Sequence, residues 1–416
     1  MSQATDPAQL RAAAANNIRR FYEFRFISHF QLWMPIWILY LHDSRGLSIA
    51  QILVLDALFE IMMMVAEVPT GVVADRWGRR RSMLLGQVGI TLAVVMFAFA
   101  PSFWWVFACY GVWAVSGALT SGSDIAFVHD SLEAQGRSGE FHRVISRGNA
   151  CQIAGMGVAS MIGAPIAALT SLETTVALSI ALAATAIPVV WRFRDPGTYT
   201  PSAEVRYFKL LGTAARRVAH NPRLRTLILL QALVNGLAWS SLLLTQVFLD
   251  QNGLPLAWFG VVLAGLHLVA MAAALLSPRV IGAVGRQRVI FMGAPAVALA
   301  LVALGVMPLW GGIAMYATLR VVLNLLGPVL VDQINRESVD EVRATIASMG
   351  TMGISVVGAA AKPVMGWSAD ANGLGSAYVI AGVSLAALGS IALLAWARVS
   401  RSGPSPAPPE AIPEPV

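Results

Sequence analysis

The feature that most constrains this chain is a series of apolar runs, each as long as the hydrocarbon core of a membrane requires. A helix needs about 20 apolar residues to cross that core. Only 12% of the residues are charged, against about 25% in soluble domains, which is too few to cover a water-facing surface of this size. The sequence therefore predicts an all-α integral membrane protein with twelve membrane-spanning helices, at roughly 21–41, 49–73, 83–101, 103–128, 148–169, 174–192, 224–249, 256–278, 289–307, 311–332, 345–367 and 376–397.

The distribution of basic residues predicts the orientation. With the N-terminus inside, the loops on the inner side hold 20 Lys or Arg residues, whereas the outer loops hold one, Arg45. This is the positive-inside rule. We therefore expect both termini on the cytoplasmic side of the cell (inner) membrane. The same loops account for the net charge of +7, so no nucleic-acid partner is needed to explain it.

A long polar segment between 192 and 225 divides the chain. We expect a cytoplasmic N-terminal segment, a six-helix bundle, a cytoplasmic linker, a second six-helix bundle and a disordered cytoplasmic tail, at 1–20, 21–192, 193–223, 224–397 and 398–416. The linker is either a plain solvated connection or a basic amphipathic helix on the inner leaflet, whose apolar face would hold Val205, Phe208, Leu211 and Val218.

The two bundles carry a repeat. A shift of 207 positions places GRRRSMLLG at 78–86 on GRQRVIFMG at 285–293. Two pseudo-symmetric halves related by an axis along the membrane normal would produce such a repeat, and transporters of that kind bind their substrate where the halves meet.

The stretch EVPTGVVADRWGRRR at 67–81 resembles the loop between helices 2 and 3 of the major facilitator superfamily, whose members are twelve-helix secondary transporters. The residues that fit the family pattern are Gly71, Asp75, Arg76, Gly78, Arg79 and Arg80. The resemblance implies that this motif latches the two halves at the cytoplasmic side, with Asp75 near the N-terminus of helix 11 and Arg79 or Arg80 paired with Asp130. The alternative is that these arginines only fix the topology.

A second stretch, NACQIAGMGVASMIGAPIAA at 149–168, is similar to the helix 5 motif of proton-coupled antiporters in that family. Gly155, Ala159 and Gly163 lie four residues apart, and Pro165 follows. The copy is degenerate, since Ala159 replaces a glycine and the final glycine pair is missing. Ordinary packing of helices through small residues is an equally good explanation.

Several charged residues fall at membrane depth, where each costs about 2.5–3.5 kcal/mol on insertion scales. Such groups usually serve function, although a fixed structural ion pair is the alternative. Asp56 lies one turn before Glu60, our first candidate for proton coupling; Glu67 and Asp124 are the others. Arg320, by the repeat, takes the place of Trp113. We expect it to meet an anionic substrate or to hold a carboxylate such as Glu60 or Asp124.

The resemblance implies that helices 1, 4, 7 and 10 line the substrate cavity. The polar and aromatic residues that they offer are His29, Gln31, Trp33, Trp113, Gln231, Asn235, Trp239, Arg320 and Asn324, and helix 11 adds Lys362. Aromatic rings with amides suit amphipathic solutes and sugars equally well.

No ATP-binding or catalytic motif is evident in the sequence. The two lysines, Lys209 and Lys362, do not follow glycine, so a Walker loop is absent. No nucleophile–base pair or metal-ligand spacing appears, and Cys109 and Cys151 fall inside apolar runs. We therefore expect no enzyme activity, no cofactor and no metal, and a monomer that meets a small molecule, protons and the lipid bilayer.

Three functions remain open. The first is proton-linked export of a small amphipathic molecule, supported by 149–168 and the buried carboxylates. The second is uptake or facilitated passage of a polar or anionic solute, supported by Arg320 and Lys362. The third is a non-transporting membrane receptor or scaffold, which would need no buried charges.

Overall fold

A computed structural model describes residues 7–195, 204–338 and 342–401. Within those ranges the chain is helical and has no strand. Ten helices or helix pairs are long and apolar enough to cross a membrane. The first segment, which is broken, and α15, which carries Lys362 and Asp370, complete the predicted twelve.

The N-terminal half holds the first six membrane segments. Its helices are α1 (Pro7–Ser28), α2 (Trp37–Leu39) with a π-helical turn (Tyr40–Ser44), α3 (Ile49–Trp77), α4 (Arg79–Ala98), α5 (Phe103–Thr120), α6 (Ser123–Glu133), α7 (Phe141–Leu169) and α8 (Leu172–Trp191). A short 3-10 turn, Ser138–Glu140, precedes α7.

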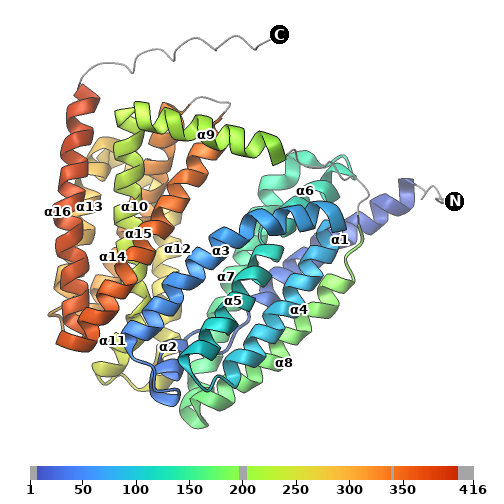
Figure 1. The fold of residues 1–416 in the computed structure, drawn as a ribbon, viewed down its shortest axis with the longest axis horizontal. Coiled ribbons are helices and arrows are strands. Elements are labelled where there is room, and N and C mark those ends of the chain that lie inside the picture. Colours follow the sequence, from blue (N-terminus) through green and yellow to red (C-terminus); the bar gives the residue numbers. More distant parts are fainter. Residues whose placement is uncertain (1–6, 196–203, 339–341, 402–416) are drawn as a thin grey trace.

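The C-terminal half repeats this arrangement. Its helices are α10 (Pro222–Leu243), α11 (Thr245–Gln251), α12 (Phe259–Val284), α13 (Arg286–Leu304), α14 (Leu309–Glu337), α15 (Arg343–Asn372) and α16 (Leu374–Arg401), and a 3-10 turn (Leu256–Trp258) precedes α12. Figure 1 shows the two bundles side by side, with α9 (Glu204–His220) lying across one end of both.

The linker therefore contains a helix rather than a plain connection. Val218 packs against the main apolar core and Ala214 is fully buried, so the last turns of α9 are attached to the body of the protein. The side chains of Val205, Phe208 and Leu211 lie outside the described residues, as do 1–6, 196–203 and 402–416 of the predicted N-terminal segment, linker and tail.

Three predicted continuous helices are wrong. The segment 21–41 is interrupted from residue 29 to residue 36, where Pro35 has no N–H to donate and disfavours helix at the residue before it. The segment 103–128 breaks at Gly122, which has φ 74°. The segment 224–249 breaks at Leu244, just after two serines that hydrogen-bond to carbonyls of their own helix.

The predicted loop between the segments 49–73 and 83–101 is instead a one-residue turn. Helix α3 runs to Trp77 and α4 begins at Arg79, so only Gly78 separates them. Its φ of 89° favours glycine, and Gly285 makes the matching turn between α12 and α13 with φ 90°. The repeat found in the sequence thus places the same backbone turn in both halves.

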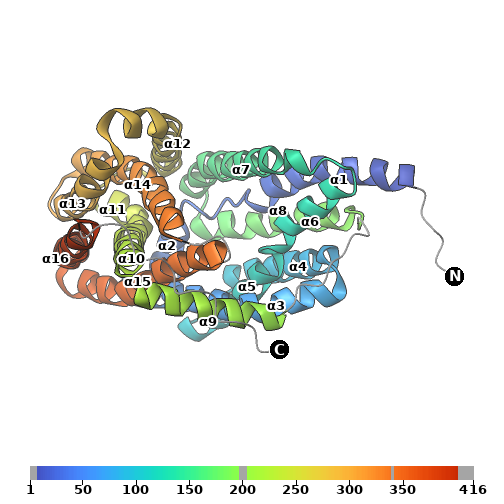
Figure 2. The same cartoon turned by 90° about the horizontal axis from the view of Figure 1, so that it is seen from above.

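We call the end of the molecule that carries α9, Gly78 and Gly285 the α9 end, and the opposite end, where Ser48 precedes α3, the Ser48 end. Helices α3 and α15 belong to different halves and run in opposite directions. Figure 1 shows them close together at the Ser48 end and spreading toward the α9 end. Viewed from above in Figure 2, α3 and α15 lie along one side of the molecule and α7 and α12 along the other.

Candidate functional site

The halves meet at a charged cluster in the middle of the bundle. The Nζ atom of Lys362, on α15, lies 2.7 Å from Oδ2 of Asp56 and 2.6 Å from Oε1 of Glu60. Both acids are on α3, one turn apart, so one helix face presents them together. The Lys362 side chain is only 3% exposed, whereas that of Glu60 is 33% exposed. The cluster therefore joins the halves and is partly open at Glu60.

This cluster borders a cavity of about 260 Å³, which we call the central pocket. Its lining residues come from both halves: Asp56, Phe59, Glu60, Gly236, Trp239, Ser240, Leu243, Ile354, Gly358 and Lys362. The second carboxylate oxygen of Glu60 is buried and makes no hydrogen bond within the described part of the chain. The pocket combines aromatic surface with one carboxylate that has unused acceptor capacity.

Arg320 contacts Trp239, a residue that lines the central pocket, and it has no acidic partner among the described residues. Its guanidinium carbon is 5.2 Å from the centre of the Trp239 ring, a cation–π contact, and its buried Nε has no hydrogen bond within the described part of the chain. The expectation that Arg320 holds Glu60 or Asp124 is wrong, because Glu60 pairs with Lys362 and Asp124 pairs with Arg25.

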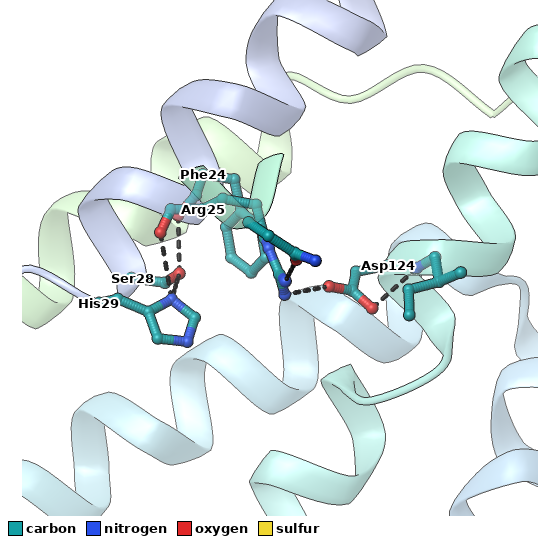
Figure 3. Close-up of polar contacts among 7 residues, drawn as sticks. Phe24, Arg25, Ser28, His29 and Asp124 are labelled. Carbon is teal, nitrogen blue, oxygen red and sulfur yellow. Dashed lines mark hydrogen bonds and ion pairs between the residues drawn. The ribbon is translucent and has the colours of Figure 1, made fainter. Parts of the chain in front are cut away.

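A second cavity, of about 290 Å³, lies inside the N-terminal half. Figure 3 shows its charged wall, where Nη1 of Arg25 lies 3.0 Å from Oδ2 of Asp124. The other Nη of Arg25 donates to Oδ1 of Asn149 at 2.5 Å. The side chains of Arg25 and Asp124 are 16% and 6% exposed, so this is a largely buried, one-to-one ion pair within one half.

The break in the first segment shapes this N-half cavity. Because α1 ends at Ser28, His29 and Gln31 lie on irregular backbone, and both line the cavity with Trp113. Nδ1 of His29 is 3.1 Å from the Arg25 carbonyl oxygen. Trp33 packs edge-on against Trp113, with ring centres 5.0 Å apart. The cavity candidates of helices 1 and 4 are therefore brought together.

The candidates of helices 7 and 10 are only partly brought together. Trp239 lines the central pocket, but Gln231 is buried and lines neither cavity. Asn235 and Asn324 each donate to the carbonyl four residues earlier on their own helix, those of Gln231 and Arg320. Such bonds leave the amide oxygens available.

The proton-coupling candidates occupy three different environments. Glu60 belongs to the inter-half cluster, and Asp124 is held by Arg25. Glu67 is exposed on α3, and no polar contact of its side chain is found in the described part of the chain. The geometry therefore separates Glu60 from the other two.

The two arginines of the motif at 71–80 that begin α4 form contacts inside the N-terminal half. Nη1 of Arg79 lies 2.8 Å from Oδ2 of Asp130, as expected, whereas Arg80 donates to the carbonyl of Trp191 at 2.5 Å. Asp75 lies in the last turn of α3. Both arginines tie α4 to neighbouring helices, which positions the Gly78 turn.

The small residues of α7 pack against the first segment. A Cβ on Gly155 would lie 2.4 Å from the Phe26 carbonyl oxygen, and one on Gly163 would lie 2.0 Å from that of Leu32. Ala159 between them is fully buried, and Pro165 lies inside the helix. The run therefore allows close backbone contact beside the N-half cavity.

Metal ligands come together at one place among the described residues. Ligand atoms of His129, Asp130 and Glu133 lie within 4.8 Å of one another, but His129 and Glu133 are exposed and Asp130 is already paired with Arg79. We assign no metal site there.

The sequence analysis did not identify Arg25 as a candidate residue. The signal that could have identified it is a cation inside an otherwise apolar segment.

Two six-helix halves around buried charges define a membrane transporter fold, and comparisons identify the family. The chain matches the Major Facilitator Superfamily over residues 24–336 and belongs to that superfamily. A stretch of 92 residues is 37% identical to YxaM of Bacillus subtilis (strain 168), an uncharacterized MFS-type transporter; it covers 22% of this chain and 23% of that protein.

Solved transporters share the fold at low sequence identity. The nucleoside transporter NupG superposes with a TM-score of 0.74 at 14% identity, covering 94% of this chain and 99% of that one. A bacterial homolog of the human lysosomal transporter Spinster, in an inward-facing and unoccupied conformation, gives 0.71 at 16% identity, covering 98% and 100%. A peptide transporter, POT, gives 0.71 at 13%, covering 96% and 99%.

Proposed function

We propose that this protein exports a small amphipathic molecule in exchange for protons, by alternating access of its two halves. The observation that carries the proposal is the position of Lys362, 2.7 Å and 2.6 Å from two carboxylates of the other half. Membership of the superfamily favours transport over a receptor or scaffold. The solute passes without chemical conversion, and one chain supplies both halves, so a monomer suffices.

Charge balance makes this cluster the coupling site. Two carboxylates face one ammonium group, which leaves one negative charge where an unbalanced charge costs about 2.5–3.5 kcal/mol. A proton on Glu60 removes that charge. Because Lys362 and the acids are on different halves, any motion that separates α15 from α3 also changes how well the acids are balanced. Proton binding is thereby linked to the relative position of the halves.

The central pocket is where the solute would bind. Phe59 and Trp239 offer aromatic surface, and Glu60 offers an acceptor in the same cavity. An amphipathic molecule that engages Glu60 competes there with the proton, which is the requirement for exchange. Export is also what the similarity of 149–168 to helix 5 of antiporters implies, although packing alone accounts for those residues in this structure.

Arg320 favours a second candidate, the uptake or facilitated passage of an anionic solute. Its guanidinium group lies over the ring of Trp239, which lines the central pocket, with no acid beside it in the described chain. An anionic group that reached Arg320 or Lys362 would be compensated on binding. In this version proton and solute bind together, because protonated Glu60 releases Lys362.

The α9 end would face the cytoplasm, and the motif at 71–80 would form the cytoplasmic gate. We place the α9 end in the cytoplasm, because the basic turns at Gly78 and Gly285 lie there. The motif residues Asp75, Arg76 and Arg79 would then act at the cytoplasmic opening. The Arg79–Asp130 pair would hold the Gly78 turn in position as the halves move.

The test uses everted membrane vesicles with an imposed proton gradient. Candidate solutes come from a toxicity screen in cells that lack their native exporters. An exported amphipathic solute should discharge the gradient in vesicles with the wild-type protein and not with Glu60→Gln. Solute movement that leaves the proton gradient intact in wild-type vesicles would contradict proton exchange. A solute that enters intact cells only together with protons would favour the second candidate, uptake of an anionic solute.

A further inference from the structure

The N-terminus of α3 is capped by a residue from the opposite half. The carboxylate of Asp370, near the end of α15, accepts hydrogen bonds from the backbone N–H groups of Ile49 at 3.0 Å and Ala50 at 2.9 Å. Ser48 caps the next N–H, that of Gln51, at 3.2 Å. The first N–H groups of a helix have no partner within it and favour a negative charge. Asp370, which belongs to the other half, supplies both the hydrogen-bond acceptor and the negative charge.

The backbones approach closely at the same place. A Cβ added to Gly366 of α15 would lie 2.6 Å from the Cα atom of Ala50. At the same end of the molecule, the side-chain amide of Gln246 on α11 also connects the two halves. Its Oε1 accepts from the Ile38 N–H at 3.1 Å, and its Nε2 donates to the Met34 carbonyl at 2.9 Å. Two pairs of membrane segments are thus joined at the Ser48 end by side chains bonded to backbone.

The sequence around Asp370 repeats part of the family motif, without its arginines. GVVADRWG at 71–78 and GWSADANG at 366–373 share a glycine, an alanine, an aspartate and a final glycine at identical spacing. Each aspartate lies three residues before a glycine that ends its helix with positive φ, 89° at Gly78 and 83° at Gly373. Each alanine, Ala74 and Ala369, is buried. The two copies therefore share four of eight residues and the same positive-φ glycine turn.

The two copies lie at opposite ends of an antiparallel helix pair. Asp75 ends α3 at the α9 end, where α15 begins, and Asp370 ends α15 at the Ser48 end, where α3 begins. We propose that Asp370 is the acid of a second latch, the counterpart of the motif at 71–78, which holds the Ser48 end closed by capping α3. Transport requires this latch to release each time that end opens.

The test measures how often the Ser48 end opens. Spin labels are placed in full-length protein in lipid nanodiscs, with both native cysteines replaced by alanine. One label pair, at Ser102 and Asn252, reports the Ser48 end, and a second pair, at Ser138 and Gln287, reports the α9 end. Asp370→Asn removes the charge while keeping the shape of the side chain. We expect the population with the Ser48 end open to rise about three- to tenfold.

Two variants serve as matched controls. Asp250→Asn removes a negative charge from the same end without touching α3, and Ser48→Ala removes the cap within α3 without touching the other half. Both should leave the distance distributions unchanged. Gly366→Ala should open the same end by a different route, through contact with Ala50. If Asp370→Asn does not differ from Asp250→Asn, or if Ser48→Ala shifts the population equally, the latch does not exist.

Discussion

Two of the buried ion clusters among the described residues differ in stoichiometry and in position. Arg25 and Asp124 form a one-to-one pair inside the N-terminal half, with Asn149 as a further partner. Lys362 serves two carboxylates and connects the halves. A balanced pair within a rigid bundle keeps its charge as the halves move, whereas an unbalanced cluster between them does not. The first is suited to holding a structure and the second to coupling it to protons.

The largest effect should follow from Lys362→Met. It leaves Asp56 and Glu60 unpaired, and breaking a buried pair costs about 3–5 kcal/mol. Transport should fall below detection, and thermal unfolding in detergent should begin earlier. Lys362→Arg, which keeps the charge, is the control. A fully active Lys362→Met protein would show that the cluster has no part in transport.

Substitutions in the Arg25–Asp124 pair should change the stability of the protein but not its proton exchange. Asp124→Asn leaves Arg25 without its counter-charge, so we expect a loss of about 3 kcal/mol in the free energy of unfolding. The double variant Arg25→Gln with Asp124→Asn should recover most of it, because neither charge is then left alone. Proton exchange per folded molecule should persist in both. Loss of exchange in the stable double variant would move the coupling role to Asp124.

Arg320→Gln should change binding more than stability. No ion pair among the described residues is lost, and the cation–π contact with Trp239 is worth about 0.5–2 kcal/mol, so the free energy of unfolding should fall by no more than that. If an anionic solute uses this residue, its affinity should fall by about 1.5–3 kcal/mol, the usual value of a hydrogen bond to a charged group. Solute binding by calorimetry measures this directly. Unchanged binding would remove Arg320 from the site.

The last comparison concerns the glycines of α7, where the smallest effect should be that of Gly157→Ala. Gly163→Ala places a methyl group 2.0 Å from the Leu32 carbonyl oxygen and should cost about 1–3 kcal/mol. Gly157, on the same helix, has open space around its Cα, so Gly157→Ala should be neutral or stabilising by up to about 1 kcal/mol. Melting temperatures of the two variants give the comparison. Equal effects would mean that Gly163 is not in close contact.

The fold could be predicted from the sequence because the lengths of the apolar runs and the charges of the loops between them can be read directly along the chain. The repeat at Gly78 and Gly285 also carried over, since a positive φ demands glycine in both halves. The breaks at 29–36 and Leu244 could not be predicted, because apolar composition is the same on straight and broken helices. Only Pro35 marked one of them.

The sequence offered candidate site residues, but it could not show which of them pair. Glu60 and Lys362 were both identified as buried charges, but they are 302 positions apart in sequence and only the packing of α3 on α15 joins them. Arg320 was assigned a carboxylate that other cations hold. Pairing depends on which helix faces meet, and spacing along one helix does not contain that information.

The most direct test of the account is proton movement by purified protein in proteoliposomes that carry a pH-sensitive dye. An outward gradient of a transported solute should drive protons the opposite way through the wild-type protein and through the double variant Arg25→Gln with Asp124→Asn. Glu60→Gln should still exchange labelled for unlabelled solute while moving no protons. Solute-driven proton movement that survives in Glu60→Gln would contradict the assignment of the inter-half cluster as the coupling site.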